Sequence, residues 1–75
     1  MLSANDTRVT ATINGERREL PERTTLETLL RALGFETATG IAVAVNARVV
    51  HRAAFPEHTL REGDAVEIIR AVAGG

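Results

Sequence analysis

The chain of 75 residues is long enough for one small domain, and a deep active-site cleft is not expected at this length. Apolar residues make up 44% of the chain, charged residues 25%, and the net charge is -1, which together exclude a disordered chain and a basic surface for nucleic acid. The chain has no cysteine for disulfides or thiolate chemistry, and it shows neither a membrane-spanning run nor a signal peptide, so we expect a cytoplasmic protein.

A β-hairpin is predicted near the start of the chain. Residues 8–13 alternate as a half-buried strand does, with one side formed by Val9, Ala11 and Ile13. The following pair, Asn14-Gly15, is the strongest short-range signal for a two-residue hairpin turn, because both residues readily adopt positive φ. A second strand is expected over residues 17–20, and Pro21 marks its end.

A short helix with one buried face follows the hairpin. Thr24 and Glu27 have the spacing of a capping box, although Thr25 is an alternative N-cap. A single apolar stripe of helical period is formed by Leu26, Leu29, Leu30 and Leu33. Gly34 lies where a left-handed C-cap belongs, and we expect Phe35 to fold back onto the stripe.

Two extended segments and an irregular loop are predicted after the helix. Residues 41–45 form a continuous apolar run whose length suits a strand better than a helix. Val49-Val50 indicates another short extended piece. Residues 51–61 have no period and contain the breaker Pro56, so we expect an irregular excursion anchored by Phe55 and Leu60.

A turn and a last strand complete the predicted fold. Glu62-Gly63-Asp64 is a turn sequence, and residues 65–70 follow it as a strand. The order of elements is typical of an α+β fold in which one helix packs across a mixed sheet of four to five strands. The expected core combines the leucine stripe with the inward side chains of the strands, namely Val9, Ile13, Leu20, Val43, Val45, Val66 and Ile68.

The chain ends on Ala73-Gly74-Gly75. Because glycine has no Cβ, a diglycine end can pass through a channel that is too narrow for other residues. A free α-carboxyl group has a pKa of about 3.5, so it is an anion at neutral pH and can attack a phosphorus centre. The alternative is a frayed terminus of small residues, which is common in any domain. We expect a flexible leader at 1–7, a folded domain at 8–70 and a flexible diglycine tail at 71–75.

Segments along most of the chain follow the pattern of one known family. They comprise residues 41–46, 49–50, 52, 60–64, 66–68 and 72–75. Together with the Asn-Gly hairpin and the leucine helix, they resemble the ThiS family of sulfur carriers in thiamine biosynthesis. The chain departs from the family pattern at His51, where these carriers often have Pro, and at Phe55, where they often have Trp.

The resemblance implies a ubiquitin-like β-grasp fold and a mechanism centred on Gly75. An E1-like adenylating enzyme (ThiF type) would use ATP to turn its carboxylate into an acyl-adenylate, and a sulfur donor protein would then produce a thiocarboxylate. Thiazole synthase (ThiG type) would use that sulfur to build the thiazole ring. The tail residues Val72, Ala73 and Gly74 would thread into the partner. The chain itself would be no enzyme, bind no cofactor and be a monomer on its own.

Besides another diglycine sulfur carrier, three other functions are open from the residues. The small subunit of molybdopterin synthase shares the fold and the diglycine, but it usually carries prolines before the terminal Val, whereas the tail here reads Arg70-Ala71-Val72. A ubiquitin-like protein modifier would join the same carboxylate to lysines of other proteins. A β-grasp interaction module with an inert tail is the third, because a fold does not determine a function.

The remaining polar residues favour structural interpretations. His51 and His58 are seven residues apart in the irregular loop, with Glu57 as the nearby carboxylate, and we expect surface histidines rather than a metal site. Asp64 follows Gly63 as the turn requires, so its expected role is side-chain to backbone bonding.

The outward face of the sheet is the candidate docking surface. Ala42 and Ala44 have the opposite parity to the inward valines of their strand, and Ile69 has the opposite parity to the inward residues of the last strand. We expect a small exposed apolar patch there, which would bind the adenylating enzyme. Arg52 and Arg70 would add charge at the rim of the patch.

Overall fold

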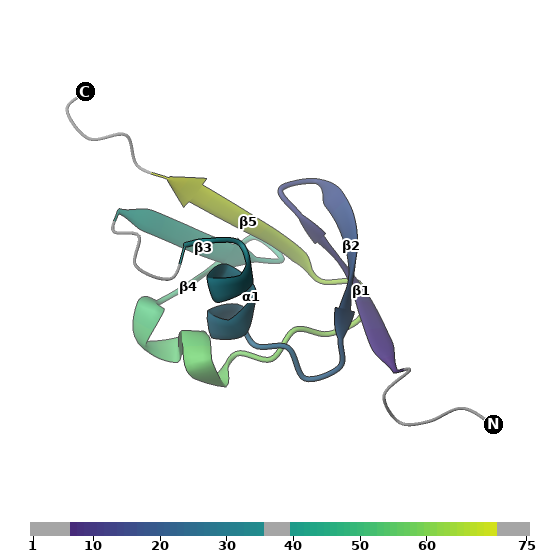
Figure 1. Cartoon of the computed structure of the whole chain (residues 1–75). Coiled ribbons are helices and arrows are strands. Elements are labelled where there is room, and N and C mark those ends of the chain that lie inside the picture. The colour runs from purple at the N-terminus through teal and green to yellow at the C-terminus, as the bar shows by residue number, and fades with distance from the viewer. Residues whose placement is uncertain (1–6, 36–39, 71–75) are drawn as a thin grey trace.

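The computed structural model describes residues 7–35 and 40–70, which form a mixed five-stranded sheet with one α-helix across one face (Figure 1). The strand order is β2-β1-β5-β3-β4. The central strand β5 pairs parallel with β1, and the other pairs are antiparallel. The elements are β1 (Arg8–Ile13), β2 (Glu16–Pro21), α1 (Leu26–Ala32), β3 (Ile41–Val45), β4 (Arg48–Val50), the 3-10 helix η2 (Arg52–Glu57) and β5 (Ala65–Arg70).

The turn between β1 and β2 has the predicted conformation. Asn14 has φ 53° and Gly15 has φ 85°, so both central residues are left-handed, as a type I′ hairpin turn requires. The side-chain Oδ1 of Asn14 also accepts a hydrogen bond of 2.7 Å from the backbone N–H of Ile68. Asn14 therefore closes the hairpin and attaches its end to β5.

The N-terminus of α1 is capped by the alternative residue. The hydroxyl of Thr25 accepts a hydrogen bond of 3.1 Å from the N–H of Thr28, so Thr25 is the N-cap and the capping box of Thr24 and Glu27 is wrong. Thr24 is buried instead, and its hydroxyl donates a hydrogen bond of 2.6 Å to the carbonyl of Pro21. Thr24 therefore precedes the N-cap by one residue, and its hydroxyl bonds to the end of β2 instead of to the first turn of α1.

The C-terminus of α1 has the predicted left-handed glycine, which directly follows the C-cap residue Leu33. Gly34 has φ 88°, and its N–H donates to the carbonyl of Arg31 at 3.2 Å. The N–H of Phe35 donates to the carbonyl of Leu30 at 2.8 Å, which completes a Schellman motif. This turn sends Phe35 back against the core, as expected from the sequence.

Two features after α1 were not predicted. The turn between β3 and β4 is another left-handed pair, with φ 53° at Asn46 and 70° at Ala47, and it makes the short extended piece a strand paired with β3. The excursion expected to be irregular contains η2. Its anchors are confirmed, because Phe55 and Leu60 are both buried.

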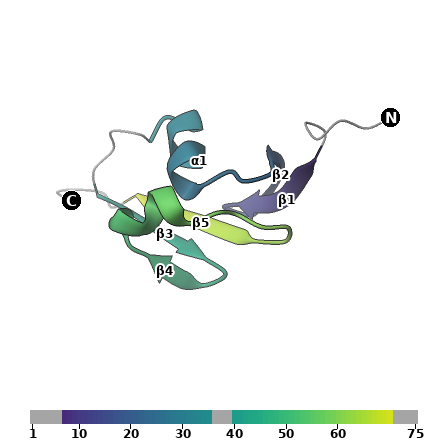
Figure 2. The same ribbon diagram turned by 90° about the horizontal axis from the view of Figure 1, so that it is seen from below.

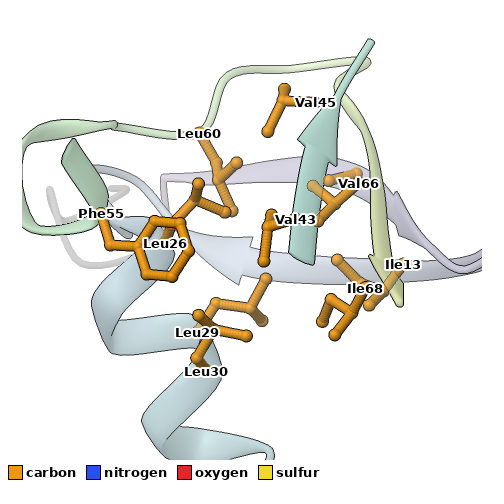
Figure 3. Packing of buried hydrophobic residues seen from close by; sticks show 11 residues of the cluster. Ile13, Leu26, Leu29, Leu30, Val43, Val45, Phe55, Leu60, Val66 and Ile68 are labelled. Atoms are coloured by element: carbon orange, nitrogen blue, oxygen red, sulfur yellow. The ribbon is translucent and has the colours of Figure 1, made fainter. Parts of the chain in front are cut away.

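The core lies between the sheet and the two helical elements, α1 and η2, which share one face (Figures 2 and 3). Val9 and Leu20 are only half-buried, since they lie toward the outer end of the β1–β2 hairpin. Ala11 is a core residue on the predicted side of β1. The buried cluster comprises Ala11, Ile13, Leu26, Leu29, Leu30, Val43, Val45, Phe55, Leu60, Val66 and Ile68.

Candidate functional site

The predicted reactive end lies just beyond the last described residue. Val72, Ala73, Gly74 and Gly75 lie outside the described residues, so their roles stay predictions. Their point of origin is Arg70, the last residue of β5, which pairs with Ile41 at the start of β3. The guanidinium carbon of Arg70 lies 5.0 Å from the centre of the Phe35 ring. This cation–π contact ties the end of β5 to the residue that follows the α1 cap.

The outward face of the sheet carries an exposed apolar surface at this end. Ile69 is 57% exposed and pairs with Ala42, which is exposed as predicted. Val49 of β4 is 70% exposed and lies on the same face, since it pairs with Ala44. The sequence did not point to Val49, because its face depends on the register of β4. We call Ala42, Val49 and Ile69 the outer patch.

Ala44 faces outward, but the expectation that it is accessible is wrong. It is only 9% exposed. On β3 it lies between Glu67 of β5 and Val49 of β4, and both side chains are larger. The small methyl group of Ala44 is therefore covered by its lateral neighbours without contributing to the core cluster.

The two arginines predicted at the rim of the outer patch lie on the other face. Arg70 has the same parity in β5 as the buried Val66 and Ile68, which turns its side chain toward Phe35. Arg52 belongs to η2 and lines a hollow beside α1. The face of Arg70 follows from the alternation along β5, and the position of Arg52 follows from η2, which the sequence did not predict.

Asp64 has the predicted structural role. Its Oδ2 accepts a hydrogen bond of 2.9 Å from the N–H of Arg61, and its Oδ1 accepts one of 2.9 Å from the side chain of Asn46. Asn46 in turn accepts a hydrogen bond of 2.9 Å from the N–H of Ala65. Gly63 adopts φ 87° in the same turn. This network joins the β3–β4 turn to the start of β5.

The histidines lie near Asp64 without forming a ligand set. His51 is exposed and His58 is half-buried. In residues 7–35 and 40–70, no group of three or more His, Cys, Asp or Glu side chains could hold a metal ion. None of the helices in these residues is long and apolar enough to cross a membrane.

Comparison with known proteins identifies the family. The model of the ThiS family matches residues 10–75 of the chain. The chain belongs to the ThiS family. The ThiS chain of Geobacter metallireducens, a thiamine biosynthesis protein, has a crystal structure that superposes with a TM-score of 0.76 at 33% identity, covering 89% of this chain and 100% of that one. Its solution structure gives a TM-score of 0.72. The fold is the ubiquitin-like β-grasp predicted from the ThiS resemblance.

Relatives of two kinds are similar in sequence to this ThiS-family chain. The sulfur carrier protein ThiS of Thermus thermophilus is 38% identical over 63 residues, which cover 84% of this chain and 95% of that protein. Thiazole synthases of Paramagnetospirillum magneticum and Magnetococcus marinus are 33% and 38% identical over 63 residues. This chain spans only 19% of the length of each thiazole synthase, so the similarity concerns one segment of those proteins.

Proposed function

We propose that the chain is a cytoplasmic sulfur carrier of thiamine biosynthesis that carries sulfur on the carboxylate of Gly75. The observation that supports this proposal best is the family match, which extends to residue 75 and so includes both terminal glycines. The end of the described domain agrees with this role, because the central strand β5 ends at Arg70, next to Ile69 of the outer patch. The same match favours thiamine biosynthesis over molybdopterin synthesis and protein modification.

The chemistry begins with the terminal carboxylate, which is ionised at neutral pH. One carboxylate oxygen of Gly75 attacks the α-phosphorus of ATP held by an E1-like adenylating enzyme, and pyrophosphate leaves. A sulfur donor protein then supplies the sulfur that displaces AMP from the carbonyl carbon and leaves a thiocarboxylate. The carrier binds no cofactor of its own and acts as a co-substrate rather than a catalyst.

Two enzymes are proposed to receive the tail. The first is the adenylating enzyme, which we place on the outer patch because exposed apolar side chains at the edge of a domain are typical of a protein contact. The second is thiazole synthase, which uses the sulfur of the thiocarboxylate. The two thiazole synthases that contain a segment similar to this chain support this partner.

Intact mass spectrometry tests the proposal. The purified chain is incubated with ATP, an adenylating enzyme and a sulfur donor, and its mass should change by the exchange of one oxygen for one sulfur. A chain that lacks Gly74 and Gly75 is the matched control, and it should stay folded by circular dichroism and stay unmodified. Covalent attachment of the intact chain to other proteins would support the modifier instead. An unchanged mass would contradict the proposed carrier function.

A further inference from the structure

The last residues of β5 are supported by a neighbouring strand on one side only. On the side of β3, pairing continues to the end of the strand, where Arg70 lies opposite Ile41. On the side of β1, the pairing within the described part of the chain ends at Ile13 and Val66. The cause is local, because the chain enters the hairpin turn at Asn14. Figure 1 shows the end of β5 running beyond this hairpin, alongside β3.

The side chain of Asn14 continues the hydrogen bonding where the backbone of β1 turns away. The N–H of Asn14 donates to the carbonyl of Val66 at 2.8 Å. Two residues further along β5, the N–H of Ile68 donates to Oδ1 of Asn14 at 2.7 Å. A side-chain oxygen therefore takes the place of the backbone carbonyl that a longer β1 would offer to β5.

The side chain of Arg70 makes a second attachment, to the residue that follows the α1 cap. Its guanidinium carbon lies 5.0 Å from the centre of the Phe35 ring, within the range of a cation–π interaction. Phe35 is itself held in place, since its N–H donates to the carbonyl of Leu30 at 2.8 Å and its side chain packs against the core. Arg70 therefore contacts a fixed partner. We call Asn14, Phe35 and Arg70 the β5 brace.

We propose that the β5 brace positions the root of the tail for binding to the adenylating enzyme. This inference rests on the proposed function. Residues 71–75 follow Arg70 directly and reach at most about 17 Å when fully extended, so the direction of β5 at Arg70 limits where the carboxylate of Gly75 can lie. An end of β5 that is already ordered in the free carrier loses less conformational freedom on binding, which makes binding tighter. Asn14, Phe35 and Arg70 are positioning residues, because they act through β5 and not on the reacting atoms.

Binding of the full chain to the adenylating enzyme tests the contact between Arg70 and Phe35. Arg70→Gln and Phe35→Leu should each raise the Kd in titration calorimetry by about two- to fivefold, as expected for an exposed cation–π pair. The rate of adenylation at saturating carrier should change by less than about twofold, since the enzyme holds the bound tail. Arg70→Lys keeps a cation over the ring and should recover most of the affinity. In the double variant the two losses should not add, because each removes the same contact.

The two turn asparagines provide a matched pair for the other attachment. Asn14 and Asn46 both have φ 53°, and each accepts a hydrogen bond from an N–H of β5. Asn14 acts at Ile68, near the tail, whereas Asn46 acts at Ala65, at the other end of the strand. Glycine keeps the left-handed conformation and removes the side-chain oxygen. Both Asn14→Gly and Asn46→Gly should lower the melting temperature, but only Asn14→Gly should also raise the Kd.

NMR order parameters of the free chain test the β5 brace without the enzyme. In Arg70→Gln and in Asn14→Gly, the backbone amide of Ile69 should have a lower order parameter than in the wild type. The amide of Val66, where β5 pairs with both neighbouring strands, should keep its value. Unchanged order at Ile69 in both variants would overturn the inference.

The outcomes separate this inference from the proposed function. Melting temperatures show which variants are folded, and Arg70→Gln together with Asn14→Gly decides the question if Phe35→Leu does not fold. An effect of Arg70→Gln that persists in full in the Phe35→Leu background means that Arg70 contacts the enzyme directly, which overturns the β5 brace. Equal rises of the Kd in Asn14→Gly and Asn46→Gly also overturn it, because lower stability alone would then explain both. Wild-type affinity in every variant of a chain that is still adenylated overturns the brace and leaves the carrier role intact, whereas a wild-type chain that is not adenylated contradicts the proposed function itself.

Discussion

Ile68 and Ile69 are consecutive residues of β5 with the same side chain, and the sheet turns them to opposite faces. Ile68 is 8% exposed and lies in the core with Val43, its partner across the strand pair (Figure 3). Ile69 is 57% exposed and pairs with Ala42 on the face that has no helix. Of these two adjacent residues, one therefore stabilises the fold by burial, and the other is exposed and accessible to a partner.

The largest expected effect is on stability, from the inward isoleucine. Ile68→Ala should lower the free energy of unfolding by about 2–5 kcal/mol, because it removes buried methyl groups and leaves a cavity. A domain of this size has about 4–11 kcal/mol in total, so the variant is near the limit of folding. Ile69→Ala should cost less than about 0.5 kcal/mol. Urea denaturation of both proteins measures the difference, and equal losses would contradict the assignment of faces.

The second prediction concerns Ala44, which faces outward but is covered. Ala44→Arg should destabilise the fold by about 1–3 kcal/mol, because the long side chain must displace Glu67 or Val49. Ala42→Arg, at an exposed position of the same strand and face, should change stability by less than about 0.5 kcal/mol. Thermal melts of the pair test this. Similar melting temperatures would mean that strand order does not limit access to this face.

The third prediction concerns binding by the outer patch. Ile69→Arg should weaken association with the adenylating enzyme by about tenfold, which corresponds to about 1.4 kcal/mol, because a charged side chain replaces an apolar contact. Stability should be unchanged, since the side chain is exposed. Calorimetric titration decides the affinity, and Ile69→Leu is the control that keeps an apolar contact. Full affinity in the Arg variant would place the adenylating enzyme elsewhere.

The features that the sequence predicted correctly have local causes. The period of the leucines, the Asn14-Gly15 turn and the glycine after α1 each act within a few residues, and all three are present in the structure. The accessibility of Ala44 and the face of Arg52 depend on which strands are neighbours and on η2, and no short pattern contains that information. The chemistry of the tail was predictable only from the diglycine end and from the family resemblance.

The two hairpin turns show why one turn could be predicted from the sequence and the other could not. Asn14 and Asn46 both have φ 53°, and the side chain of each accepts a hydrogen bond from a backbone N–H of β5. The first turn was predicted because glycine follows asparagine. The second was missed because Ala47 occupies the left-handed position, where alanine is uncommon. The β3–β4 turn matters for the outer patch, because it sets the register that brings Val49 beside Ala44.

The smallest expected effect is a stabilisation at that second turn. Ala47→Gly should raise the free energy of unfolding by about 0.5 kcal/mol, because relief of the left-handed strain slightly exceeds the entropy that glycine adds to the unfolded chain. Gly15→Ala, the reverse substitution at the first turn, is the control. A Cβ at Gly15 would meet nothing within 4 Å, so only the strain of φ 85° acts, and a loss of similar size is expected. Denaturation curves of both variants would show opposite shifts. A loss in Ala47→Gly would mean that the side chain of Ala47 contributes packing that outweighs its backbone strain, and the register of Val49 would then depend on more than the turn.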